Sequence, residues 1–230
     1  MTDLTHRSLA DEQMDAPDLS PATYDAVLAD LARVNGWTLA ARPTIAFLNR
    51  LARRGDRLRI LDVGFGQGDM LRRIARWGEG AGVTVDLVGI DLNSRSAPAA
   101  RATTPDAIRI DYRTGDYADL AGEHWDVILS SLVAHHMSHA QLVAFLRFME
   151  AKAARGWLVN DLHRHRVAHF GYPLLARMIR THRIVREDGT LSIARAYRPH
   201  EWPPILAEAG VERARVVRRF PFRLCVERCR

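Results

Sequence analysis

Three glycines alternate along the chain directly after an acidic residue, an arrangement suited to holding a ligand against bare main chain. In residues 58–69 an apolar run ends at Asp62 and is followed by Gly64, Gly66 and Gly68. The pattern predicts a buried strand whose tip turns tightly. A second apolar run, 83–91, ends in Asp91, where a carboxylate can hold ribose hydroxyls. The two runs together predict an adenosine-type cofactor on an α/β sheet.

The spacing of the glycines narrows the choice of cofactor. A dinucleotide fingerprint, G-x-G-x-x-G, would need a glycine where Asp69 or Leu71 stands. A phosphate-binding P-loop would need Gly-Lys-Ser or Gly-Lys-Thr, which the sequence lacks. An acid at the tip of the strand would repel a pyrophosphate, so it favours a cationic or amine-bearing ligand.

This segment resembles motif I of the class I S-adenosylmethionine-dependent methyltransferases. The chain from residue 57 to about 162 follows the motif order of that family. The segments 125–137 and 157–164 are similar to a bacterial subgroup of small-molecule methyltransferases, associated with phenolic or quinone-like lipids and polyketides. The resemblance implies S-adenosylmethionine as cofactor.

The resemblance also implies roles for individual residues at the cofactor site. The three glycines lie along the methionine portion, Asp62 binds its ammonium group, and Asp91 accepts from both ribose hydroxyls. The other expected contacts are, in chain order, Leu92 on the adenine face, Asp116 at the adenine amino group, the Tyr117 main-chain N–H beside it, and Ser131 or its neighbour Ser130 at the sulfur end. Two structural alternatives stay open, since Asp62 can cap the helix beginning near 69 and Asp116 can form an Asx turn.

Histidines follow two of the predicted strands, where an open α/β sheet places its ligands. His135 and His136 follow the fourth strand, and His163 follows the fifth. An oxygen acceptor needs a base for its hydroxyl proton, and histidine suits that role near neutral pH. We predict His136 and His163 as the catalytic candidates, His135 as an acceptor contact, and Asp161 as a residue able to orient one of them. The adjacent pair could instead cap a helix or pack against Met137.

A metal site is not predicted from the histidine spacing. His163, His165 and His169 would have to converge across a strand-to-helix turn, which three rings rarely do. The interleaved arginines, Arg164 and Arg166, would also oppose a cation.

Strand and helix patterns alternate from residue 58 onward. The predicted strands are 58–63, 83–90, 108–112, 125–130 and 156–162, followed by a closing hairpin of 211–217 and 222–226. Helical patterns fall between them, notably at 69–77 and 139–154. Such alternation predicts an α/β fold with a doubly wound, mostly parallel seven-stranded sheet of the Rossmann-like type.

The residues before the sheet predict a separate helical piece. Residues 1–19 carry no periodicity and predict a flexible arm, and 20–54 predict an N-terminal helical extension or cap. Ser20-Pro21 reads as a helix start, a second helix is expected over 39–54, and 33–37 as a break between them that presents Trp37. The methyltransferase domain is then 55–230.

The region 164–186 predicts a lid over a hydrophobic, aromatic acceptor. Residues 167–179 are more apolar than a surface helix requires, and we expect Phe170, Met178 and Trp37 to contact the acceptor. An ordinary amphipathic helix closing the sheet is the alternative.

Composition bounds the class of protein. The 230 residues are 47% hydrophobic, and they contain no uninterrupted apolar stretch of about 20 residues. The start shows no signal-peptide pattern, and the two cysteines lie at 225 and 229, so a cytoplasmic location is expected. Although the net charge is +6, the arginines are scattered, which argues against nucleic-acid binding. Transient contact of the basic C-terminal stretch with a membrane surface stays open, as does the choice between monomer and homodimer.

The sequence therefore predicts methyl transfer to a small hydrophobic molecule, with a phenolic or enolic oxygen as the favoured acceptor. Three alternatives stay open: carbon methylation of a quinone-type ring, an RNA methyltransferase, and a non-catalytic cofactor-binding protein.

Overall fold

The computed structural model describes residues 4–16 and 18–230. A seven-stranded sheet forms its centre, in the order β3-β2-β1-β4-β5-β7-β6. The strands are β1 (Arg57–Val63), β2 (Thr84–Asp91), β3 (Asp111–Thr114), β4 (Trp125–Ser131), β5 (Ala153–Leu162), β6 (Arg215–Arg219) and β7 (Arg223–Cys229). The first five are parallel, whereas β7 runs antiparallel to both of its neighbours. The predicted doubly wound, mostly parallel sheet is confirmed, with strand ends shifted by a few residues.

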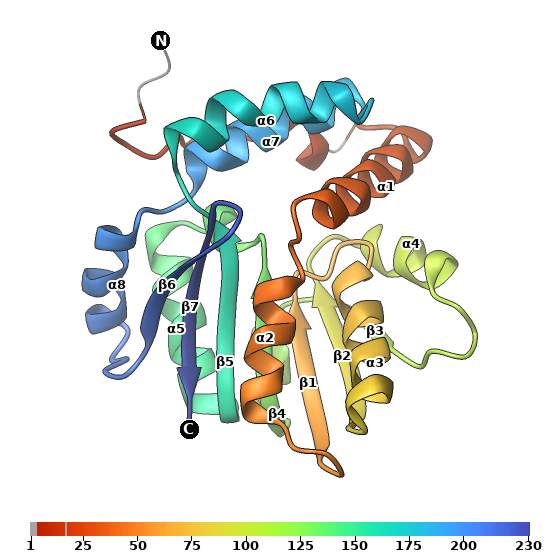
Figure 1. Cartoon of the computed structure of the whole chain (residues 1–230), viewed down its shortest axis with the longest axis vertical. Helices are drawn as coiled ribbons and strands as arrows, with labels where there is room; N and C mark the ends of the chain where they lie inside the picture. Colours follow the sequence, from red (N-terminus) through yellow and green to blue (C-terminus); the bar gives the residue numbers. More distant parts are fainter. Residues whose placement is uncertain (1–3, 17) are drawn as a thin grey trace.

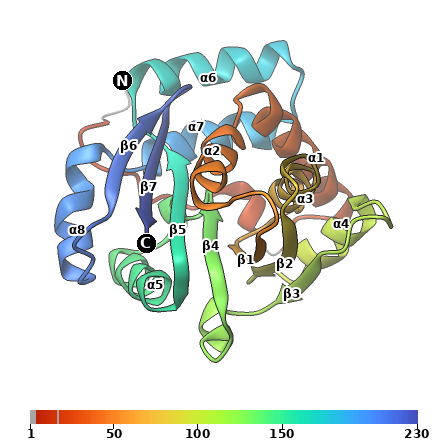
Figure 2. The same ribbon diagram turned by 60° about the horizontal axis from the view of Figure 1, so that its bottom comes forward.

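Helices cover both faces of the sheet, as doubly wound folds require. One face packs on α2 (Arg42–Leu51) and α3 (Asp69–Ala81) through a core that includes Phe47 and Ile74. The other packs on α5 (His139–Lys152) and α8 (Trp202–Glu208) through a core that includes Phe145 and Trp202. The remaining short helix beside the sheet is α4 (Ser96–Thr103), next to β3. Figures 1 and 2 show the two layers.

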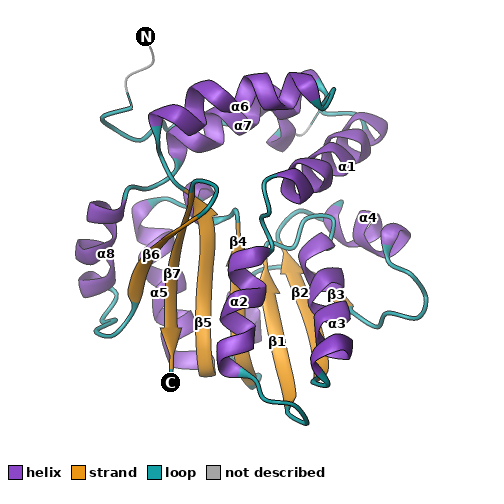
Figure 3. Cartoon of the chain, viewed as in Figure 1, coloured by secondary structure: helices purple, strands orange, loops and turns teal. Residues whose placement is uncertain are grey.

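Three further helices form a cap over the carboxyl ends of the parallel strands (Figures 1 and 3). They are α1 (Pro21–Trp37), α6 (Arg166–Met178) and α7 (Arg183–Arg195). A small apolar core of Val27, Ile184 and Val185 joins α1 to α7. This cap lies over the strand ends where α/β sheets bind ligands, so it covers the expected ligand site.

The structure corrects two predictions about the N-terminal region. The break expected at 33–37 is helical, since α1 continues to Trp37, and the second helix is shorter than predicted. The predicted start at Ser20 is confirmed, because its hydroxyl accepts from the Thr23 N–H and Pro21 opens the helix.

The flexible arm is also wrong for the part of 1–19 that the structure describes. The Met14 N–H donates to Asp188 Oδ2 (2.9 Å), and Arg195 Nη1 donates to the Ala10 carbonyl (2.7 Å). Leu4 and Glu12 are buried. Residues 1–3 and 17 lie outside the described part. The arm therefore packs along α7, and polar contacts of this kind leave no periodic pattern in a sequence.

No helix in the described part of the chain is long and apolar enough to cross a membrane.

Candidate active site

A cavity of about 730 Å³ lies between the sheet and the cap. Its lining comes from the tip of β1, the end of β2, the loop after β4, the cap helices α1, α6 and α7, and the turn before β7. Such a volume is in the range of small-molecule and cofactor sites. The cofactor motif and the histidine loop predicted separately from the sequence thus face one cavity.

The loop that contains the three glycines turns through residues with left-handed backbone conformations. Gly64, Gly66 and Gly68 have φ values of 77°, 53° and 75°. A Cβ at Gly64 would lie 2.3 Å from Val133 Cγ2, but a Cβ at Gly66 would meet nothing within 4 Å. Gly64 and Gly66 line the cavity. Gly68 instead caps α3 and packs against Tyr112, so its contribution is to shape the loop.

Asp62 is buried at the end of β1 with an unsatisfied oxygen facing this loop. Its Oδ1 has no hydrogen-bond partner among the described residues. Burial, reinforced by the charges of Asp69 and Asp91, raises the pKa of Asp62 well above its ordinary value. The alternative of a helix cap is not supported, because Gly68 occupies the N-cap position of α3 and Asp62 Oδ1 accepts no hydrogen bond from the helix start. A cationic ligand group would supply the partner that the carboxylate lacks.

Asp91 holds the loop in place as well as facing the cavity. Its Oδ2 accepts from the Gly66 N–H and its Oδ1 from the Asn93 N–H, each at 2.9 Å. Each carboxylate oxygen accepts more than one hydrogen bond, so both stay available to ribose hydroxyls. Leu92 also lines the cavity and is 76% exposed.

The third predicted carboxylate is placed differently. Asp116 is exposed, lies outside the cavity lining and caps a short 3₁₀ helix (Tyr117–Leu120) through the Ala118 N–H, at 2.9 Å. The Asx-type alternative is therefore what the structure shows. Tyr117 does line the cavity. Of the two serines, Ser131 lines the cavity, whereas Ser130 is buried and donates to the Val63 carbonyl.

The histidine loop carries a buried His–Asp pair. His135 Nδ1 lies 2.7 Å from Asp161 Oδ1, and the main-chain N–H of His135 donates to Asp161 Oδ2 at 2.9 Å. The two residues come from the ends of neighbouring parallel strands, β4 and β5. Although burial alone would raise the pKa of Asp161, the charge and hydrogen bond of His135 lower it below its ordinary value. In the neutral form of His135, this contact favours the tautomer with the proton on Nδ1, which leaves the lone pair on Nε2.

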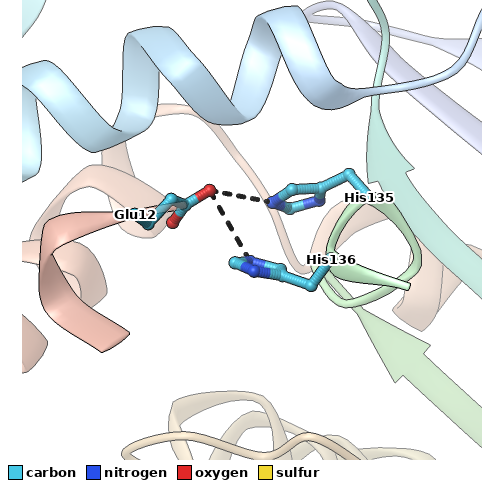
Figure 4. Close-up of side chains that lie close together, drawn as sticks. All are labelled: Glu12, His135 and His136. Carbon is cyan, nitrogen blue, oxygen red and sulfur yellow. Dashed lines mark ion pairs between the residues drawn. The ribbon is translucent and has the colours of Figure 1, made fainter. Parts of the chain in front are cut away.

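Glu12 approaches both adjacent histidines from the N-terminal segment (Figure 4). Its Oε1 lies 3.8 Å from His135 Nε2 and 3.8 Å from His136 Nε2. Ser192 of α7 donates to the same oxygen at 2.7 Å. Burial raises the pKa of Glu12. Burial, with the nearby charges of His135 and Arg195, lowers the pKa of His136 to about 3.

Among the described residues, Glu12, His135 and His136 form the group whose ligand atoms could hold a metal ion, since one such atom from each lies within 4.8 Å of the other two. The 3.8 Å separations exceed the roughly 3.3 Å between neighbouring ligands of a tetrahedral zinc ion. Arginine groups lie behind the pair: Arg195 Nε and Arg7 Nη2 donate to the His135 carbonyl. The expectation of no metal stays a prediction.

His163 lies apart from this group. It is outside the cavity lining, and its main-chain N–H donates to the Phe222 carbonyl. Burial, with the charge of Arg218 and other neighbours, lowers the pKa of His163 to about 4. His165 caps α6 by accepting from the Val167 N–H. The geometry does not support His163 as a base, because it lies outside the cavity lining, although Leu162 directly before it belongs to that lining.

The helix α6, in the region predicted as a lid, borders the cavity with a different face from the one predicted. Tyr172 and Leu175 of α6 line the cavity. Phe170 and Met178 lie outside the lining and are 56% and 71% exposed. The expectation that these two contact the acceptor is not supported, because sequence pattern locates an apolar helix without giving its rotation. Trp37, 67% exposed, does lie at the cavity.

Sequence reasoning also missed Arg223, a buried cation on the cavity wall. Its Nη2 donates to Thr38 Oγ1, while its Nη1 has no partner among the described residues. Burial lowers the pKa of Arg223, and Asp161 and Asp69 are among the groups close enough to act on it. One arginine among many carries no sequence signal. An anionic ligand group would satisfy it.

Comparison with known proteins supports the resemblance drawn from the sequence. Residues 60–156 match a family described as "Methyltransferase domain". Two curated relatives are named ubiquinone biosynthesis O-methyltransferase. That of Azorhizobium caulinodans is 38% identical over 93 residues, which are 39% of this chain and 34% of the relative. That of Cereibacter sphaeroides is 38% identical over 84 residues, 35% of this chain and 32% of the relative. The matched part thus spans about a third of each of these relatives.

Solved structures show the same fold at low identity. A methyltransferase from Aquifex aeolicus has a TM-score of 0.58 at 17% identity, covering 91% of this chain and 98% of that one. The plantazolicin methyltransferase BamL, solved with SAH, has a TM-score of 0.58 at 14% identity, covering 79% and 66%. Residues 60–156 thus match a methyltransferase domain, and the chain has the fold of S-adenosylmethionine-dependent methyltransferases, whose cofactor is S-adenosylmethionine.

Proposed function

We propose that this protein transfers the methyl group of S-adenosylmethionine to a phenolic or enolic oxygen of a small, largely apolar acceptor. The observation that carries the proposal is the 2.7 Å contact between His135 Nδ1 and Asp161 Oδ1, which holds a histidine that lines the same cavity as Asp62 and Asp91. When bound, the cofactor supplies a methyl group on a sulfonium, which is a good leaving group.

The residues at the β1 and β2 end fit this cofactor. Asp62 would bind the ammonium group with its unpaired Oδ1, and Arg223 the carboxylate with its unpaired Nη1. Asp91 would hold the ribose, Leu92 would pack on the adenine, and Gly64 and Gly66 would line the methionine portion. Tyr117 and Ser131 keep their expected places at the adenine and at the sulfur end. Asp116 would have to accept from the adenine amino group with Oδ2, since Oδ1 caps the 3₁₀ helix.

His135 is the residue placed to take the hydroxyl proton. Asp161 holds the proton of His135 on Nδ1. The Nε2 atom can then accept the hydroxyl proton of the acceptor while the acceptor oxygen bonds to the methyl carbon. The imidazolium formed would lie between Asp161 and Glu12, and their charges would stabilise it. His136 is a weaker proton acceptor than an ordinary imidazole, because burial lowers its pKa to about 3. We therefore assign His136 to contacting the acceptor, the reverse of the roles predicted for the pair.

The apolar wall of the cavity supports a hydrophobic acceptor. Side chains from α1, α6 and α7 line it, including Leu28, Leu31, Tyr172, Leu175 and Ile193. Such a lining excludes water from the reacting atoms, which methyl transfer requires. The region 164–186 would then serve as the lid, with Trp37 beside it.

A methyl-label assay tests the proposal. The full chain is incubated with deuteromethyl S-adenosylmethionine and a panel of alkylated phenols and enolic diketones, and the products are fragmented by mass spectrometry. We expect label on oxygen, and loss of transfer in His135→Ala and Asp161→Asn. Label on a ring carbon alone would support the alternative of carbon methylation, and no transfer to any acceptor would contradict the proposal. We expect EDTA to change nothing; loss of activity in EDTA would instead make Glu12, His135 and His136 a metal site.

A further inference from the structure

The outward face of α6 carries an exposed apolar stripe. Val167, Phe170, Leu174 and Met178 are 60%, 56%, 64% and 71% exposed. Their spacing of three and four residues places them along one side of the helix. Exposed residues of this kind are ordinary when single, but a continuous row of them marks a surface that binds something apolar.

Basic residues accompany the stripe, and α6 contains no acidic residue. Arg166 and Arg177 are exposed, and their helical positions fall within about 40° of Phe170. Arg180 and Arg183 follow the helix and are exposed as well. The surface therefore combines apolar side chains with a positive rim.

The turn between β6 and β7 extends this surface. Phe220 is 78% exposed at the turn, and Arg218 beside it is exposed. The rings of Phe222 and His165 lie 5.1 Å apart, which places the turn against the start of α6. Figures 1 and 2 both show the turn next to this end of the helix. We call the set Val167, Phe170, Leu174, Met178 and Phe220 the α6 face.

The α6 face borders the cavity. Val167 belongs to both, and Phe222 of the neighbouring turn also lines the cavity. Gly171 and Leu175, the next residues around α6, line it too. An apolar molecule could thus pass from the α6 face into the cavity along one continuous wall.

We propose that the α6 face binds the surface of an anionic lipid bilayer and that the acceptor enters the cavity from it. Apolar side chains in the acyl boundary and arginines at the headgroups are the chemistry of an interfacial helix. The entry of the acceptor rests on the proposed function, but the binding does not. A second copy is a poorer occupant, because a two-fold contact through this face would bring the arginines of both copies together.

Vesicle sedimentation tests the binding. The full chain is spun with phosphatidylcholine vesicles, with or without phosphatidylglycerol. We expect binding to the mixed vesicles that weakens with added salt, and weaker binding to the neutral ones. The variant Leu174→Glu with Met178→Glu should lose at least about 10-fold in vesicle affinity. Leu9→Glu is the matched control, since Leu9 is 84% exposed but lies on the N-terminal segment.

Activity on a water-soluble phenol separates this proposal from the proposed function. Neither Leu174 nor Met178 lines the cavity, so turnover of that phenol should be unchanged in the double variant. Equal vesicle binding by wild type and double variant, or no binding by wild type, would overturn the proposal. So would a dimer that the double variant converts to a monomer. Vesicle binding without any hydroxyl methylation would contradict the proposed function and leave the α6 face standing.

Discussion

The cofactor end and the acceptor end of the cavity are built from different kinds of sequence. At the cofactor end, Asp62, the glycine loop and Asp91 come from two short stretches on paired strands, where Asp62 lies opposite Gly89. At the acceptor end, Glu12, His135 and Asp161 come from an N-terminal segment and two strand ends, and the cap helices supply the apolar wall. One end is therefore local in the chain, whereas the other exists only once the whole chain has folded.

The largest expected effect is at Asp91. Replacing it with alanine removes two charged hydrogen bonds to the loop and the ribose contacts, and each such bond contributes roughly 1.5–3 kcal/mol. We expect SAH affinity to fall about 100-fold or more, measured by calorimetry. Asp116→Ala is the comparison: it would remove one contact to the adenine amino group from outside the cavity lining, so its SAH affinity should fall by much less. Equal losses would mean that the cofactor end is misassigned.

The second-largest effect, at His135, should distinguish the acceptor end from the cofactor end, because it changes turnover without changing cofactor affinity. His135→Ala should lower kcat about 100-fold, because it removes the base. SAH affinity should stay near that of the wild type, because His135 is not a cofactor contact. Asp161→Asn should give a similar loss, and the double variant should be little worse than either single one. Additive losses would show that the two residues do not act together.

Arg223, on β7, extends the cofactor end across β4 and β5. Arg223→Met should weaken SAH binding about 10-fold, since a charge-assisted contact to the carboxylate is lost. The melting temperature should not fall, because the substitution removes a buried cation with an unpaired nitrogen. The exposed Arg218→Met is the control. Lower stability with unchanged affinity would assign Arg223 a structural role only.

The lid offers a matched pair on one helix. Leu175→Ala should raise the acceptor KM about 10-fold, because Leu175 lines the cavity. Phe170→Ala, on the outward face, should leave the KM for a soluble acceptor unchanged. The reverse result would restore the substrate contact predicted from the sequence and would mean that α6 is rotated from the position described.

The smallest effect is the pH dependence of cofactor affinity. The ionised form of Asp62 attracts the ammonium group, and its pKa is raised. SAH affinity should therefore fall on acidification at a higher pH than an ordinary aspartate would cause. Asp62→Asn should reduce this dependence and leave the part due to Asp91, whose pKa burial also raises. His136, with a pKa of about 3, stays neutral throughout and should add no inflection. An unchanged profile in Asp62→Asn would rule out its role.

This contrast explains which residues could be predicted. The strands of the mostly parallel sheet and the loop from Asp62 to Gly68 follow from local apolar runs and glycines, so the sequence predicts them well. Glu12 is beyond such reasoning, because its contact with the histidines depends on how the N-terminal segment packs on α7. The choice between His135 and His136 depends on which ring reaches Asp161, and adjacent residues leave no periodic signal for it. Phe170 and Leu175 likewise share a helix whose rotation tertiary packing alone decides.

A crystal structure with SAH would test the central claim most directly, namely that one cavity holds the cofactor at the glycine loop and the acceptor oxygen at His135. We predict the ammonium group at Asp62, the carboxylate at Arg223, the ribose at Asp91, and the sulfur open toward His135 Nε2. SAH bound with its sulfur turned away from His135, or bound outside the cavity, would contradict the account.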